Sequence, residues 1–381
     1  MQAPQITFST TGWIGNPYGS ICSFNADCSM FSCIAVDHWQ IRTISGALYL
    51  DIETLPAQAG DLKWSRTDPR YFYYISGNRL MTSDVDWKAQ TAVHEFTEYI
   101  SIYGGGESDI SPDNDHFVLA GTKTDGAVEV FVYSLKDGKG PVYPQTQPFD
   151  GLKIDGKHRI ILSRSDGIFV IDSAAKSILK ICDTNGHAAL TLDADGSDVL
   201  IWTSNQDNGI YKVPIDGRLR TLLMTPPWQV AVDISCPDRG DPIVSTYSLD
   251  PGYPGRVLQV ALDGSGSTGL CETGSVQIKM SDGSWAYNCQ PKASVSRDGR
   301  YIIGCSNFGK TADPNYCDCF LFELNSAHVN AVTPEQNSTE TIVKDKYGEE
   351  WILLGTVPYD ESTDVISTSA DSKTLATYRR K

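Results

Sequence analysis

Apolar residues in this chain alternate with polar ones over short stretches, a pattern that indicates half-buried β-strands rather than helices. One unit recurs: an alternating stretch, a turn containing Asp or Gly, and an apolar strand. Asp and Gly tolerate the left-handed backbone that a tight hairpin requires. The copies are LKWSRTDPRYFYYIS from Leu62, SDISPDNDHFVLAG from Ser108, GLKIDGKHRIILS from Gly151, ALTLDADGSDVLIW from Ala189, AVDISCPDRGDPIVS from Ala231, ASVSRDGRYIIGC from Ala293 and VISTSADSKTLATY from Val365.

The spacing of the seven copies is roughly forty residues, with two longer gaps, which is typical of four-stranded propeller blades. We therefore expect an all-β chain in which residues 1–381 form one seven-bladed β-propeller, rather than a β-sandwich or two β domains. The last copy has room for two strands only, so strands from both ends of the chain would share one blade and leave no sheet edge open. The expected blades are 61–98, 107–148, 150–184, 187–226, 229–273, 290–334, and 364–379 together with 35–55.

The net charge of −16 disfavours nucleic acid and anionic membrane surfaces as partners. No apolar run is long enough to span a bilayer. An anionic sugar stays possible as a partner, because one cationic pocket can outweigh the global charge. We expect a monomer that binds a polysaccharide or oligosaccharide.

The ten cysteines show no paired CxxC spacing of the kind that metal sites use, so disulfides in an oxidising compartment are expected. Proximity in the repeat suggests Cys271 with Cys289, and Cys305 with Cys317 or Cys319. The sequon NST at 337–339 fits a secretory route, and the opening MQAPQITFST fits a leader replaced by a start methionine. The expected location is extracellular.

In a propeller, the loops that enter each inner strand and those that join its second and third strands share one face around the channel. The glycines at 104–106 would let the backbone approach the channel axis, which places Glu107 at its rim. The alternative is that Glu107 and Asp109 only bond the backbones of neighbouring blades. Long entry loops at 83–106, 273–291 and 333–364 carry aromatic residues that suit stacking on sugar rings. The substrate-binding candidates on this face are Glu107, Asn205, Lys292, Trp228, Trp285, Asn307 and Lys310.

Two histidines on this face are candidates for proton transfer, His187 at the start of a repeat copy and His94 in the first long loop. His116 and His158 follow repeat turns and are expected on the opposite face, in structural or solvent roles. Arg164 would bind a carboxylate, or else pair with Asp166.

The acidic turn LDADGSD superficially suggests a calcium site, but it lacks the last ligand of an EF-hand and occupies a repeat turn. No cofactor and no metal ligand set is expected. A calcium ion in the channel is left open.

The blade number and repeats such as ASVSRDGRYIIGC and SDISPDNDHFVLAG resemble the TolB-type propellers. Among enzymes, the chain resembles the propeller polysaccharide lyases, namely oligogalacturonate lyases, ulvan lyases, and fungal lyases that release rhamnose from rhamnosyl-glucuronate ends of arabinogalactan. It lacks the multi-histidine metal site expected of oligogalacturonate lyases, and the cysteines and sequon favour the secreted fungal subgroup.

This resemblance implies β-elimination beside a uronate carboxylate, in which stabilising the developing negative charge is the main requirement. From its position on this face, Arg164 is the expected neutralising cation, helped by Asn205 or Lys292. His187 or His94 would be the base, and Tyr247 or the other histidine the acid.

Two alternatives stay open. One is a glycoside hydrolase that uses Glu107 with a rim aspartate such as Asp61, Asp150 or Asp364. The other is a carbohydrate-binding propeller without catalysis. Since the copies differ sharply at their rim positions, one asymmetric pocket is expected instead of seven equal sites.

Overall fold

The structure is a computed structural model of the 381-residue chain. It describes residues 5–7, 13–56, 62–229, 231–247, 254–280, 282–283, 285–287, 290–310, 313 and 316–324, and the strands within 342–344, 350–358 and 374–380. The chain divides into two compact units, Met1–Val329 and Asn330–Lys381. Nothing helical in the described part has both the length and the hydrophobicity of a membrane span.

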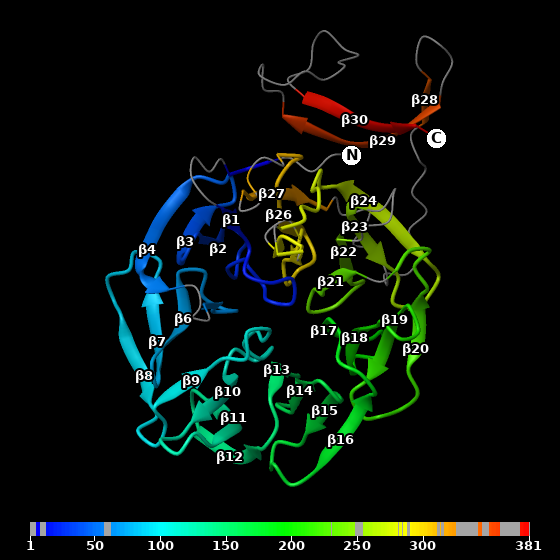
Figure 1. The fold of residues 1–381 in the computed structure, drawn as a ribbon. Helices are drawn as coiled ribbons and strands as arrows, with labels where there is room; N and C mark the ends of the chain where they lie inside the picture. The colour runs from blue at the N-terminus through cyan, green and yellow to red at the C-terminus, as the bar shows by residue number, and fades with distance from the viewer. Residues whose placement is uncertain are drawn as a thin grey trace. The chain divides into compact units, whose positions relative to one another are not determined.

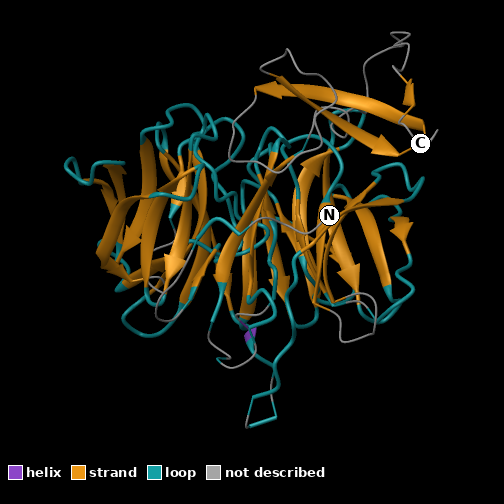
Figure 2. Ribbon diagram, turned by 90° about the horizontal axis from the view of Figure 1, so that it is seen from above, coloured by secondary structure: helices purple, strands orange, loops and turns teal. Residues whose placement is uncertain are grey.

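Seven antiparallel sheets follow one another around a central channel in the first unit, so the expected seven-bladed β-propeller is confirmed (Figures 1 and 2). The strands of the first three blades are β1 (Ile14–Gly15), β2 (Met30–Ala35), β3 (His38–Thr43) and β4 (Leu48–Pro56); β5 (Lys63–Trp64), β6 (Tyr71–Ser76), β7 (Arg79–Asp84) and β8 (Thr91–Glu95); and β9 (Ser101–Tyr103), β10 (His116–Thr122), β11 (Val128–Ser134) and β12 (Gly138–Gln145).

The remaining four blades repeat the same order from the channel outward. Their strands are β13 (Phe149–Ile154), β14 (Ile160–Arg164), β15 (Gly167–Ile171) and β16 (Ile178–Cys182); β17 (Ala188–Leu192), β18 (Asp198–Ser204), β19 (Gly209–Pro214) and β20 (Thr221–Met224); β21 (Val232–Ser235), β22 (Ile243–Tyr247), β23 (Pro254–Val260) and β24 (Ser267–Glu272); and β25 (Ser294–Val295), β26 (Tyr301–Ser306) and β27 (Asp318–Glu323).

The hydrophobic core lies between the blades. On β18, Leu200 packs toward the fourth blade and its neighbour Ile201 toward the sixth, and both are fully buried. Each blade is therefore covered on both faces, which is why its middle strands read as continuous apolar runs such as VLIW rather than as strict alternation.

The N-terminal segment closes the ring by pairing with the last strand of the propeller. Gln5 forms an antiparallel bridge with Phe320, and the Ile6 amide donates to the Cys319 carbonyl at 2.9 Å. Thr7 Oγ1 donates to Asp318 Oδ1 and accepts from the Cys319 amide, each at 2.8 Å. Residues 5–7 thus take the fourth position of the seventh blade, beside β27.

The strands that close the ring differ from those expected. Residues 35–55 belong with β1 to a complete first blade, because 14–15 supply the inner strand that the C-terminal copy was expected to provide. The C-terminal strands β28 (Ile342–Lys344), β29 (Glu350–Pro358) and β30 (Thr374–Arg380) form a three-stranded sheet of their own in the second unit. Most of the copy that begins at Val365 lies outside the described residues.

The described cysteines are free thiols, which differs from the expected disulfide framework. Cys305, Cys317 and Cys319 are buried where β26 and β27 meet the first blade. Burial raises the pKa of the Cys317 thiol. Cys289, the expected partner of Cys271, lies outside the described residues.

Candidate functional site

Two segments leave their blades and enter the channel. In the first blade, β1 pairs with one end of β2 while Phe24 pairs with Phe31 near the other, so residues 16–22 project from the sheet. In the third blade, β9 pairs with one end of β10 and the Ser111 amide donates to the His116 carbonyl near the other, so residues 104–109 project likewise. The two projections meet where Ser20 Oγ donates to the Glu107 carbonyl at 3.3 Å.

The glycines before Glu107 allow a close approach to the fourth blade, whereas the approach expected of them was to the channel axis. Gly105 has φ +86°, and a Cβ there would lie 2.6 Å from Leu152 Cβ of the fourth blade. Gly106 has φ +65°, and its Cβ would lie 2.2 Å from the Tyr103 hydroxyl. A side chain at Gly105 would push this projection away from the fourth blade, whereas at Gly106 the Tyr103 hydroxyl would have to move.

His187 lies just before β17 and faces the start of the next blade. Its Nδ1 is 2.6 Å from the Val232 carbonyl and 3.1 Å from Asp233 Oδ1. The Asp233 side chain is 1% exposed, and within the described residues its oxygens have no conventional hydrogen bond. Burial opposes the charging of His187, but the Asp233 carboxylate outweighs it and raises the pKa of the imidazole.

Two tyrosines flank this histidine. The Tyr18 ring, from the first projection, meets the His187 ring edge-on at a centroid distance of 5.8 Å, and the Tyr247 ring lies at 6.1 Å. Burial raises the pKa of both phenols above its ordinary value, and the negative charges of Glu107 and Asp233 add to the effect at Tyr18. Both hydroxyls therefore stay protonated across the neutral range.

Lys292 supplies a buried cation next to Tyr287, a phenol close enough to Tyr18 and Tyr247 to raise the pKa of each. Its side chain is 5% exposed, and its Nζ lies 3.3 Å from the centroid of the Tyr287 ring. The backbone at Lys292 has φ +44° and is held by Asn16, whose amide Nδ2 donates to the Lys292 carbonyl. Within the described residues, this cation–π contact with Tyr287 is the interaction that stabilises the Lys292 ammonium.

The two acids of the second projection, Glu107 and Asp109, form ion pairs with neighbouring blades. Glu107 forms an ion pair with Lys153 of the fourth blade. Asp109 accepts from Arg297 Nε at 2.9 Å and Nη2 at 3.0 Å, and Arg66 lies at 3.4 Å. Both acids bond neighbouring blades, but through side chains and not through the backbones that were expected.

A cavity of about 110 Å³ occupies the channel beside these pairs. Its walls include Ser20, Glu107, Lys153, Asp109 and Arg297, but not His187, Tyr247 or Lys292. The cavity is a charged space along the channel, distinct from the surroundings of the histidine. We place the candidate site at the histidine, because that is where unsatisfied and titratable groups converge.

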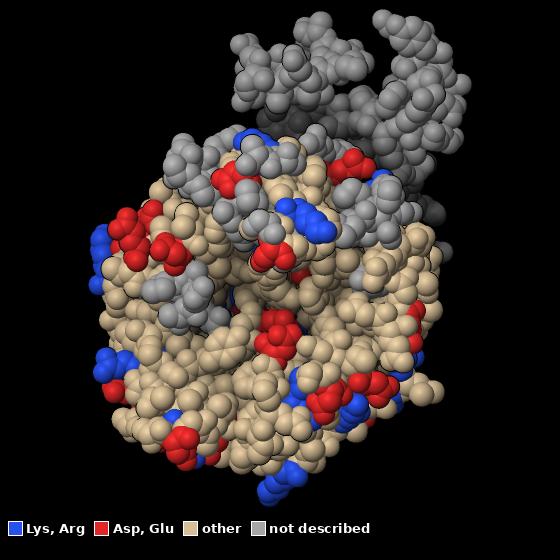
Figure 3. All heavy atoms as spheres, in the orientation of Figure 1, with Lys and Arg blue, Asp and Glu red and all other residues tan. Residues whose placement is uncertain are grey.

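The face of the ring drawn in Figure 3 is hollowed near its centre, and acidic side chains gather at the hollow. An anionic ligand entering such a surface needs a local cation to offset the repulsion.

Several candidates from the sequence lie away from His187. His94 is on β8, the outer strand of its blade (Figure 1), where its ring packs 4.5 Å from Phe96. The expected loop 83–106 in fact contains β8 and β9. Arg164 ends β14, bonds Asp166 bidentately at 2.9 and 2.8 Å, and lies 4.0 Å over Phe169.

The remaining binding candidates are spread over the molecule. Trp228 is buried in the core between the fifth and sixth blades, and Asn307 is buried while its side chain bonds the Val276 backbone. Trp285 is 42% exposed, with Lys279 5.9 Å from its ring. Asn205 is exposed in the turn after β18, and Lys310 is exposed beside the Tyr316 hydroxyl.

Sequence reasoning missed Tyr18 and the carboxylate behind His187. Tyr18 stands in the segment NPYGS, where the turn-forming residues around it indicate an ordinary loop and give no sign of a site. Asp233 belongs to a repeat copy, where it looks like any other rim position. Its distance of one blade length from His187 is the signal that identifies it once the ring is known.

No protein-family model matches this chain, and no curated protein matches it. Solved structures match it by fold. An oligogalacturonate lyase from Vibrio parahaemolyticus has a TM-score of 0.60 at 12% identity, covering 85% of this chain and 94% of that one. An oligogalacturonate lyase in complex with manganese has a TM-score of 0.60 at 13% identity, covering 86% and 99%.

A chain of the mitotic checkpoint complex matches with a TM-score of 0.50 at 14% identity, covering 85% of this chain and 97% of that one. These likenesses show the propeller fold alone. The same fold in a lyase and in a checkpoint assembly means that function has to be argued from the site.

Proposed function

We propose that the chain is a polysaccharide lyase that cleaves a glycosidic bond to a uronic acid by β-elimination. The observation that carries the proposal is the convergence of His187, backed by the buried Asp233, with two phenols and with Lys292. The match to two oligogalacturonate lyases supports the class of substrate, since a uronate is what those enzymes are named for.

His187 is the base in this proposal. Its Nδ1 faces Val232 and Asp233, so Nε2 is the nitrogen left to accept the proton at C5 of the uronate. Asp233 fixes this tautomer and stabilises the imidazolium that forms. The nearly complete burial of Asp233 keeps solvent from screening that interaction.

Tyr18 and Tyr247 are the candidate acids. A leaving oxygen needs a proton as the bond to it breaks, and a phenol that stays protonated at neutral pH supplies one. Tyr247 was expected in this role, and Tyr18 is the second phenol in contact with the same imidazole.

Lys292 neutralises the substrate carboxylate, which makes the C5 proton acidic enough to be removed. Lys292 was expected only as a helper of Arg164. The Arg164 guanidinium is engaged by Asp166, whereas the Lys292 ammonium lies on an aromatic face from which a carboxylate can draw it. The principal cation in the proposal is therefore Lys292.

Within this class we propose an extracellular enzyme acting on rhamnosyl-glucuronate ends of arabinogalactan. The sequon supports this finer reading, whereas the described cysteines, as free thiols, do not. Glu107 is held by Lys153, which leaves the hydrolase mechanism without a free carboxylate at that position.

The test is a screen against gum arabic, pectin fragments and ulvan. Ultraviolet absorbance reports the unsaturated uronate, and released sugars are measured in parallel. We expect absorbance to rise, and His187→Ala and Lys292→Met to lower the rate about 100-fold or more. His94→Ala, on an outer strand, is the matched control and should retain the wild-type rate.

Three results contradict the proposal. Sugar release without absorbance indicates a hydrolase. Glycan binding without either signal indicates a carbohydrate-binding propeller. An equal loss in His94→Ala and His187→Ala removes the assignment of the base.

A further inference from the structure

A second group of convergent side chains lies in the repeat turns of the third and fourth blades. Asp113 stands in the turn before β10, His116 is the first residue of β10, and His158 stands in the turn between β13 and β14. Turns that join first and second strands emerge on the face opposite to the entry loops. The group is therefore separate from the surroundings of His187.

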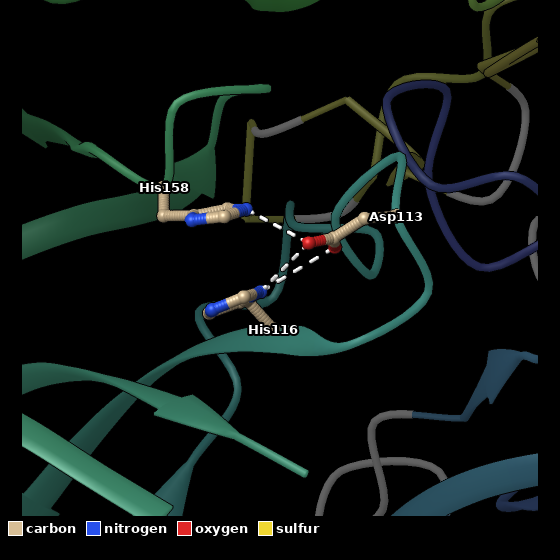
Figure 4. A group of neighbouring side chains, drawn as sticks. All are labelled: Asp113, His116 and His158. Carbon is tan, nitrogen blue, oxygen red and sulfur yellow. Dashed lines mark hydrogen bonds and ion pairs between the residues drawn. The ribbon is translucent and has the colours of Figure 1, made fainter. Parts of the chain in front are cut away.

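The two histidines direct one nitrogen each at the same carboxylate. His116 Nδ1 lies 3.1 Å from Asp113 Oδ2, and His158 Nε2 lies 2.9 Å from the same oxygen (Figure 4). The imidazole rings are stacked, with centroids 3.5 Å apart and planes 16° apart. One ligand atom from each of the three residues lies within 4.8 Å of the others.

These distances are close to those of a metal site. A tetrahedral zinc ion with bonds of about 2.0–2.1 Å needs its ligand atoms about 3.4 Å apart. Both measured distances fall a few tenths of an ångström short of that, and the two near-parallel rings must also tilt apart for both lone pairs to meet at one ion. Two imidazoles and a carboxylate are also a ligand set that zinc and related ions prefer over calcium or magnesium.

The surroundings hold the three side chains in place. Ser111 Oγ donates to Asp113 Oδ1, and the Asp115 amide donates to the same oxygen at 3.2 Å. His158 is held in the left-handed region at φ +61°, which is uncommon for a residue with a side chain. This backbone conformation directs the His158 ring toward the third blade.

The charge at the group also suits a cation. Asp115 Oδ2 lies 3.4 Å from His116 Nδ1, so two carboxylates surround two imidazoles. With both rings neutral the group carries two negative charges, which one divalent ion balances. The side chains of His116, His158 and Asp113 are 15%, 33% and 42% exposed, so an ion has access from solvent.

We propose that Asp113, His116 and His158 bind one divalent transition-metal ion of the zinc type, which joins the third and fourth blades. His116 Nδ1, His158 Nε2 and an oxygen of Asp113 are the ligands, and water takes the open position. Each ring then carries its proton on the other nitrogen, so neutral imidazoles bind without loss of a proton. The ion stabilises the contact between two blades and has no part in the reaction at His187.

The test is isothermal titration of the full chain with zinc chloride after chelator treatment and dialysis. We expect one equivalent to bind the wild-type chain. His158→Gln and Asp113→Asn should each weaken binding at least about tenfold, since loss of even an outer partner of a metal ligand has that effect. The matched control is His38→Gln, because His38 also lies between two carboxylates, Asp37 at 3.0 Å and Asp51 at 2.7 Å, without a second histidine.

X-ray absorption of the zinc-loaded wild-type chain tests the site without any substitution. The expected spectrum has nitrogen and oxygen neighbours with the multiple scattering of two imidazoles. A sulfur shell at about 2.3 Å would show that thiolates hold the ion and would overturn the proposal. So would the absence of stoichiometric binding, or zinc binding in His158→Gln equal to that of the wild type.

Discussion

At the scale of single residues, two aspartates of the channel, Asp109 and Asp233, differ in how many polar partners they have. We infer from this difference that one stabilises the fold and the other serves the chemistry. Asp109 is saturated by the fork of Arg297 and by Arg66, and this network holds blades together. Asp233 is buried more deeply, with a side chain 1% exposed against 16% for Asp109, but within the described residues it has one close polar partner from a neighbouring blade, a histidine. A buried carboxylate with so little compensation is costly to the fold, which is typical of a residue kept for its effect on a neighbour.

Asp233→Asn tests that effect through the pH profile of kcat/KM. The carboxylate raises the pKa of His187 above the ordinary value of 6.5, so the base becomes active as the pH rises through that higher pKa. The amide removes the charge, so the acid limb of the profile should move to lower pH. The plateau value of kcat/KM should fall about 100-fold or more, because the amide neither fixes the tautomer of His187 nor stabilises its imidazolium.

A plateau that falls without movement of the acid limb would mean that Asp233 only fills space. Asp241→Asn is the control for a neutralised carboxylate in the same blade. Asp241 accepts from the Leu262 amide at 2.9 Å, and its substitution should leave the limb unchanged.

At the scale of elements, the projection at 104–109 depends on glycine at one position where two blades nearly touch. Gly105→Ala should destabilise the fold by about 1–3 kcal/mol, because the added Cβ meets the fully buried Leu152. Gly126→Ala is the matched control, since Gly126 has φ +83° and open space around its Cβ. Denaturant midpoints compare the two variants, and equal losses would show that backbone conformation alone sets the cost.

The strands of the propeller could be predicted where the repeat unit is regular. The copies that begin at Leu62, Ser108, Gly151, Ala189, Ala231 and Ala293 all contain the turn that leads into the second strand of a blade. The first blade was missed, although its hairpin, SFNADCSMFSC, has Asp27 in the turn, where it accepts from the Ser29 amide at 3.0 Å. The seventh predicted copy lies instead in the second unit, at the C-terminus.

The candidate site could be predicted only in part, for a related reason. Position within the repeat indicated His187, Tyr247 and Lys292, because entry loops and second-to-third-strand loops converge on the channel. It also indicated His94, since a stretch without a clear repeat unit was interpreted as one long loop. The partners that give His187 its chemistry come from other blades, and no local pattern encodes which blades become neighbours.

At the scale of the whole molecule, the propeller depends on one seam. Around most of the ring each blade is continuous in sequence, but the last blade combines β25–β27 with residues 5–7. Without that segment β27 presents an unpaired edge, which is a site for opening and for association with other chains. The seam therefore limits the stability of the ring more than any single blade does.

Thr7→Val tests the seam with a change of one hydroxyl. Thr7 is 1% exposed and links Asp318 and the Cys319 amide, so the variant leaves two buried polar groups short of a partner. The expected cost is about 1–3 kcal/mol. Hydrogen exchange should quicken first at β27, because that strand loses its outer neighbour before the other blades open.

Thr221→Val, at an exposed position on the outer strand β20, is the control. If exchange at β27 stayed at the wild-type rate while the whole ring lost stability evenly, closure would be shared by all blades, and the N-terminal segment would not be its weak point.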